Sequence, residues 1–180
     1  MKRFLLAAAI SSAATVSLAQ VWNETGDAGD QLATAQSITS AFDSVTGTIT
    51  QNTDEVDMYR FTISNPVTFG VNAIGTSVDT EIFLFNASGN GVAGNDDWYG
   101  AQSALGATVG AASSGPGSIP GLTSGIYYLA IGRFSTIPRD SASASIFGNL
   151  AGNGSVNSGV GALDHWTYAQ APSTAYTLNF

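Results

Sequence analysis

The stretch Asp54-Glu-Val-Asp-Met-Tyr-Arg-Phe-Thr-Ile63 carries the clearest structural pattern in this chain of 180 residues. Every second residue after Val56 falls on one face of an extended backbone: Asp57, Tyr59, Phe61 and Ile63. A period of two with β-branched and aromatic residues is typical of a β-strand. The stretch therefore predicts a strand that begins just after an acidic turn.

The same period recurs along the rest of the chain. Further strands are expected over residues 45–50, 67–73, 80–85, 126–131, 141–147 and 175–180, with Gly-, Ser- and Asn-rich connections between them. One short helix is expected from Asp30 to about Ile38, because Asp30 is a suitable N-cap and apolar residues follow at helical spacing. The predicted fold is all-β, an antiparallel β-sandwich of jelly-roll-like form with one short N-terminal helix.

The N-terminus has the pattern of a secretory signal peptide. Met1-Lys-Arg3 is positive, an apolar run follows, and Ser17-Leu-Ala19 places small residues before a cut at Gln20. The alternative, a membrane anchor, is disfavoured because the run is short and interrupted by serines, whereas about 20 apolar residues span a bilayer. We expect residues 1–19 to be removed and residues 20–180 to form one domain that is secreted, extracellular or periplasmic, and free of the membrane after cleavage.

Composition excludes several functions. The chain has 13 acidic and 5 basic residues, a formal net charge of −8 and no cysteine. Beyond Lys2 and Arg3 its cations are three scattered arginines, too few for the basic patch that binds nucleic acid. Without cysteine there are no disulfides, thiolate metal sites or cysteine nucleophiles.

The acidic residues are clustered beside turns and strand starts. The clusters are Glu24/Asp27/Asp30, Asp54/Glu55/Asp57, Asp79/Glu81 and Asp96/Asp97. No lysine follows residue 2 to neutralise them, and calcium is bound by six to eight oxygens from flexible loops. From the residues themselves, a calcium site and a set of solvated turn residues with a helix cap both stay open.

A second loop has some of the spacing of an EF-hand. Asn86, Ser88 and Asn90 occupy positions one, three and five, glycine occupies position six, and Asp97 falls at position twelve. One interpretation is a second, weak metal site formed by Asn86, Ser88, Asn90 and Asp97. The other interpretation is a hairpin connection rich in turn-forming residues.

The order of these segments resembles the bacterial pre-peptidase C-terminal domain family, whose relatives include the collagen-binding domains of clostridial collagenases. The resemblance covers most of residues 22–180. The segments that carry it are Asp27-Ala-Gly-Asp30, Asp54-Glu-Val-Asp-Met-Tyr-Arg-Phe61, Asp79-Thr-Glu-Ile-Phe-Leu-Phe85, Asn95-Asp-Asp97, Gly125-Ile-Tyr-Tyr-Leu-Ala-Ile131 and Ala175-Tyr-Thr-Leu-Asn-Phe180.

The resemblance implies a calcium-stabilised β-sandwich. Calcium-binding members use the N-terminal acidic segment and the Asp-x-x-Asp turn. The implied ligands are Asp27, Asp30, Asp54 and Asp57, with Glu24 as a fifth. The chain departs from the family pattern at Ala28 and Gly29, where Pro and Asn are usual.

The sequence predicts no enzyme. The one histidine, His165, is the only base available to a serine nucleophile, and its neighbour Asp164 is expected to point to the opposite side of an extended chain. A structural or accessory extracellular module is the first hypothesis, and a hydrolase is the last.

The second hypothesis is a module that binds an extracellular polysaccharide or protein polymer through Trp98, Tyr99 and Trp166. These aromatics can equally fill the ends of the sandwich. The oligomeric state is left open.

Overall fold

The structure is a computed structural model that describes residues 19–98, 100–106, 108–109, 113–114, 116–150, 156–170 and 172–180. Within these residues all regular secondary structure is β-strand. Apart from Ala19, the expected signal peptide lies outside the described residues.

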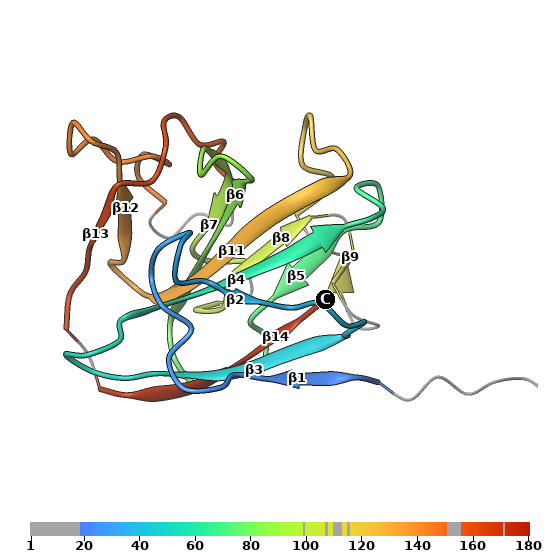
Figure 1. The fold of residues 1–180 in the computed structure, drawn as a ribbon, viewed down its shortest axis with the longest axis horizontal. Coiled ribbons are helices and arrows are strands. Elements are labelled where there is room, and N and C mark those ends of the chain that lie inside the picture. Colours follow the sequence, from blue (N-terminus) through green and yellow to red (C-terminus); the bar gives the residue numbers. More distant parts are fainter. Residues whose placement is uncertain are drawn as a thin grey trace, which may run out of the picture.

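Two five-stranded sheets form the body of the domain (Figure 1). The first has the order β1 (Val21–Asn23), β3 (Ser44–Ile49), β14 (Thr174–Asn179), β5 (Gly70–Asn72) and β8 (Ala104–Gly106). The second has the order β2 (Gln36–Ser37), β4 (Val56–Ile63), β11 (Gly125–Arg133), β6 (Thr80–Asn86) and β7 (Gly91–Asn95). Small two-stranded sheets are formed by β9 (Thr108–Val109) with β10 (Ser113–Ser114) and by β12 (Ile137–Arg139) with β13 (His165–Thr167).

The strand order is that of a jelly roll. The edge strands β1 and β2 pair in parallel with β3 and β4, and the other pairings of both large sheets are antiparallel. The remaining strands have the orders β3-β14-β5-β8 and β4-β11-β6-β7. Following these eight strands along the chain, each connection passes from one sheet to the other, except the β6–β7 hairpin, which stays within one sheet. The predicted antiparallel, jelly-roll-like sandwich is confirmed.

Two hydrophobic clusters hold the layers together. The first lies between the sheets and includes Val45, Ile49, Tyr59, Phe61, Ile82, Leu84, Leu129, Ile131, Tyr176 and Leu178. The second covers the outer face of the β4-β11-β6 sheet and includes Val56, Met58, Phe83, Phe85, Ala130, Phe147 and Trp166. The central strands of this sheet are therefore buried on both faces, which explains their nearly continuous apolar runs.

The expected helix from Asp30 to about Ile38 is wrong. The backbone makes a single turn, in which the amides of Thr34 and Ala35 both donate to the Gln31 carbonyl. The chain then extends as β2 beside β4, and the Ile38 amide donates to the Arg60 carbonyl at 2.8 Å. A helix this short is marginal by itself, and pairing with a sheet edge supplies hydrogen bonds that it lacks.

Two strand predictions and one loop prediction also need correction. Residues 141–147 form a turn instead of a strand, because the Asp140 carboxylate accepts from the amides of Ala142 and Ala144. The strand expected over 67–73 is only β5, and Val67 before it is exposed. Strand β7 lies in a segment expected to be a loop, since Gly and Asn dominate its composition.

A buried ion pair fastens the start of β4 to the end of β11. Glu55 and Arg133 form a salt bridge with side chains only 3% and 5% exposed. The Asn52 amide donates to the same carboxylate at 2.9 Å, and Arg133 donates to the carbonyl of Pro172 just before β14. The pair thus connects three segments that are distant in sequence and holds the β3–β4 turn in place.

We predict that Arg133→Met destabilises the domain by about 3–5 kcal/mol, because it leaves the Glu55 carboxylate buried without its counter-charge. The double variant Glu55→Met/Arg133→Met should recover most of this loss, since no charge then remains buried. Urea unfolding followed by tryptophan fluorescence measures both. Equal destabilisation in the single and double variants would contradict the assignment.

Candidate metal centre

The β3–β4 turn carries two of the carboxylates that the sequence singled out. The amides of Thr50 and Asp54 donate to each other's carbonyl oxygens at 2.7 and 2.9 Å, which closes a tight turn. Asn52 occupies it with a φ of 66°, a left-handed conformation that asparagine tolerates well. Asp54 is therefore held beside the first residues of β4.

Asp57 lies on the inner face of β4 and is fully buried. Neither of its carboxylate oxygens accepts a hydrogen bond of normal geometry within the described part of the chain. Its pKa is raised from an ordinary value of 3.8 to about 9, chiefly by burial and also by the carboxylates of Asp54 and Glu24, against the lowering effect of the Tyr176 hydroxyl. Such a group lacks the compensation that a buried charge requires.

Glu24 reaches the same point from the N-terminal segment after β1. Its Oε1 accepts from the Ala28 amide at 2.9 Å, and its Oε2 accepts from the Thr48 amide at 2.8 Å. One carboxylate oxygen from each of Glu24, Asp54 and Asp57 lies within 4.8 Å of the others. Three hard oxygen donors therefore converge from two segments that are about thirty residues apart, a donor set that suits calcium.

Asp27 and Asp30 lie at the border of this group. Both are exposed, and together with Asp54 and Tyr168 they line a cavity of about 160 Å³. Burial, together with the carboxylates of Asp27 and Glu24, raises the pKa of Asp54 to about 7. The fold thus brings the N-terminal acidic segment to the Asp54–Asp57 turn, and the central group, Glu24, Asp54 and Asp57, is the tightest part of it.

Several neighbours of this group were not singled out from the sequence. The hydroxyls of Tyr59 and Tyr176 are hydrogen-bonded to each other in the buried interior. Gly47 pairs with Tyr176, and a Cβ there would clash with the Tyr176 hydroxyl and lie 2.7 Å from Glu24 Oε2. The alternation in residues 175–180 was enough to place Tyr176 on a buried face, but not to show which carboxylate it faces.

The second metal site expected from the EF-hand spacing is not assembled. Asn86 Oδ1 accepts from the amides of Ser88 and Asn90, which makes this segment the β6–β7 hairpin turn. Asp97 follows the far end of β7, and a five-residue strand rises roughly 16 Å. Asp97 instead meets Asp79 and Asp96, with one oxygen of each within 4.8 Å, because β6 and β7 are antiparallel neighbours.

The aromatics proposed to bind a ligand lie in different environments. Trp98 is half-buried and borders a cavity of about 350 Å³, and Tyr99 lies outside the described residues. Trp166 matches the alternative of a core-filling aromatic: it is 8% exposed within the second cluster, and its indole N–H donates to the Asp30 carbonyl at 2.6 Å. Its ring fills the outer core instead of facing solvent.

The expected separation of Asp164 and His165 is also wrong. His165 Nδ1 lies 2.9 Å from Asp164 Oδ2, with side chains 41% and 56% exposed. Asp164 precedes β13, so the alternation of an extended strand does not apply to the pair.

No protein-family model matches the chain, and none of the curated proteins matches it. Among the described residues, no helix is long and apolar enough to cross a bilayer.

We predict that the calcium-free domain loses stability as the pH rises. The raised pKa values of Asp57 and Asp54 mean that the folded state binds protons more tightly than the unfolded state between about pH 4 and 9. Unfolding free energy in calcium-free buffer should therefore be more than about 1 kcal/mol lower at pH 8 than at pH 5. Asp57→Asn should flatten this dependence and be more stable than the wild type at pH 8. Equal wild-type stability at the two pH values would contradict the prediction.

Proposed function

We propose that the chain is an exported, non-catalytic β-sandwich module of the pre-peptidase C-terminal type, stabilised by calcium and serving a structural or accessory role outside the cell or in the periplasm. The observation that carries the proposal is the buried Asp57 carboxylate, which has no hydrogen bond of normal geometry and faces Glu24 and Asp54. The jelly-roll order and the position of the Asp54–Asp57 turn are consistent with the family resemblance.

The chemistry of the donors favours calcium. Glu24, Asp54 and Asp57 supply three carboxylates, and Asp27 and Asp30 at the edge of the group can complete a shell of six to eight oxygens together with water. The described ion pairs contain no lysine or arginine at this group. A divalent cation removes the mutual repulsion of the carboxylates and the cost of burying Asp57.

The same ion would act as a cross-link. Glu24 lies between β1 and the turn at residues 31–35, whereas Asp54 lies in the β3–β4 connection and Asp57 at the start of β4. An ion that binds only the folded state stabilises it by mass action, in a chain that has no cysteine for disulfides. The proposed role is non-catalytic because Asp57 is fully buried between the sheets, where its carboxylate is not open to a substrate.

We predict that calcium raises the thermal midpoint of the chain at neutral pH. Calcium at one hundred times its dissociation constant contributes about 2.7 kcal/mol, or roughly 5–10 °C for a domain of this size. Differential scanning calorimetry in calcium and in EGTA measures the shift, and magnesium should produce a smaller one because it requires a tighter octahedral shell.

Matched variants locate the effect. Asp57→Asn should abolish the calcium-induced shift while the domain still folds, whereas Asp43→Asn, which changes an exposed carboxylate near β3, should keep the full shift. The proposal fails if calcium and EGTA give the same midpoint in the wild type, or if Asp57→Asn responds as the wild type does.

A second candidate function, binding of an extracellular polysaccharide or protein polymer, is favoured by one observation. Trp98 is half-buried beside a cavity of about 350 Å³ whose other lining residues are mostly small or apolar, among them Val92, Pro116 and Ile119. An indole at the edge of such a cavity offers a stacking surface for a sugar ring or a peptide.

We predict that, if this second function holds, the domain is retained on one insoluble polymer and that Trp98→Ala reduces retention by at least tenfold. Sedimentation with cellulose, chitin and fibrillar collagen measures it. Trp166→Phe is the matched aromatic control, because this ring is buried and should not change retention. No retention on any of the polymers, or equal retention of Trp98→Ala, would count against this function.

A further inference from the structure

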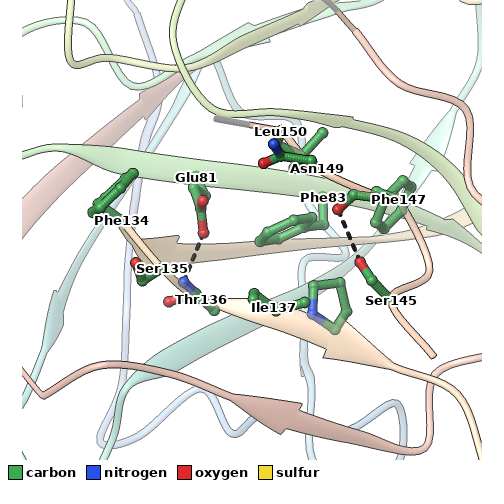
Figure 2. Close-up of a pocket in the computed structure, with 12 residues that line it drawn as sticks. Glu81, Phe83, Phe134, Ser135, Thr136, Ile137, Ser145, Phe147, Asn149 and Leu150 are labelled. Carbon is green, nitrogen blue, oxygen red and sulfur yellow. Dashed lines mark hydrogen bonds between the residues drawn. The ribbon is translucent and has the colours of Figure 1, made fainter. Parts of the chain in front are cut away.

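A separate cavity lies between the outer face of β6 and strand β12. Its volume is about 100 Å³, and Glu81 and Phe83 enter it from β6, opposite Ile137 and Pro138 of β12. Figure 2 shows Glu81 beside Ser135 and Thr136, whereas Phe83 lies nearer to Phe147 along the same strand. The cavity therefore has a carboxylate in one part and aromatic rings in another.

Glu81 is the only ionisable residue among those that line the cavity. It is 5% exposed, and its Oε2 accepts from the Thr136 amide at 2.7 Å. The apolar walls are formed by Phe83, Phe134, Ile137, Pro138, Phe147 and Leu150. The described arginines of β11 and β12 are engaged elsewhere, Arg133 with Glu55 and Arg139 with Thr167 and Ser143. Glu81 thus has no positive counter-charge among the described residues.

The surroundings of Glu81 on the β6 side are acidic. Asp96, which follows β7, and Asp79, which precedes β6, both act on it, whereas β12 and residues 145–150 bring no titratable group into the cavity. Burial and then the Asp96 carboxylate raise its pKa to about 8, while the Thr136 and Ser135 amides lower it. A cation in the cavity would offset both the burial and the repulsion.

We propose that this cavity binds an organic ammonium group carried on a short apolar chain, either a free alkylamine or the side chain of a lysine in an extracellular polypeptide. The ammonium group pairs with Glu81, and the methylene chain packs along Phe83 and Ile137, whose surfaces it keeps from water. This site is independent of the proposed calcium centre.

The walls disfavour other ligands. A sugar would bury several hydroxyls against Phe83, Ile137 and Leu150, which offer no side-chain hydrogen-bonding atoms, and each unpaired hydroxyl costs free energy. A carboxylate or phosphate would meet Glu81 and Asp96 as like charges. The one competing explanation is that Glu81 serves only as an acceptor for the turn at Thr136.

Glu81→Gln separates these two roles. The amide oxygen of glutamine can still accept from the Thr136 N–H, so the turn is kept while the charge is lost. Calorimetric titration with n-butylammonium in an amine-free buffer without phosphate, with calcium present, should show binding to the wild type, and Glu81→Gln should weaken it at least tenfold. Asp43→Asn removes an exposed carboxylate elsewhere and should leave the affinity unchanged. 1-Pentanol, a neutral analogue of similar length, should bind at least tenfold more weakly than n-butylammonium.

Two further arms test the geometry and the source of the ligand. Ile137→Phe fills the cavity without changing its charge and should also lose the affinity, with amide NMR shifts in the wild type centred on Thr136 and Phe147. A peptide with one central lysine and blocked ends identifies a polypeptide source if it binds more tightly than n-butylammonium, and a free amine if it binds more weakly. No binding of either compound, or equal binding to the wild type and Glu81→Gln, would overturn the proposal.

The pH dependence gives an independent readout. Affinity for n-butylammonium should rise by up to about tenfold per unit between pH 6 and 8 and level off above about pH 8, as Glu81 becomes ionised. An affinity that stays constant over this range would contradict pairing with Glu81.

Discussion

The burial of the Asp57 carboxylate is the constraint on which the rest of this end of the sandwich depends. A carboxylate placed in the interior without a hydrogen bond of normal geometry is costly, and its pKa of about 9 expresses that cost. The groups around it are two tyrosine hydroxyls and two further carboxylates, so the described part of the chain supplies no positive charge there. Charge compensation by a proton or a cation follows from this arrangement.

The carboxylates at this turn differ in whether an arginine neutralises them. Glu55 is neutralised by Arg133, which also reaches the segment before β14, so this ion pair fixes the β3–β4 connection mechanically. Asp54 and Asp57, one and two positions away, have no such partner among the residues that the structure describes and face Glu24 instead. This difference explains how one short segment can be both a firm structural element and a candidate cation site. Glu81, on the outer face of the second sheet, is another buried carboxylate without an arginine or lysine partner among the described residues.

Periodicity predicted most of the central strands because successive side chains of a strand point to opposite faces of its sheet. Strand β4 begins and ends where the pattern predicts, and the doubly apolar run in β6 reflects one core on each side of its sheet. The pattern fails at Gln36–Ser37, whose backbone pairs with a sheet edge although its side chains are polar, and at Trp166, whose indole fills the outer core although it lies in a polar, glycine-rich region. In both places contacts distant in sequence override the local preference.

The sequence by itself determined most of the central strands, the surplus of acid over base and the two acidic segments near residues 24–30 and 54–57, because these depend on composition and on local periodicity. The tertiary structure alone decided which carboxylates meet. It brought Glu24 to Asp57, separated Asp97 from Asn86 and joined it to Asp79, and enclosed Glu81 beneath β12. Sheet pairing and the crossing of the chain between sheets set these distances, and neither leaves a signal in the spacing of residues along the chain.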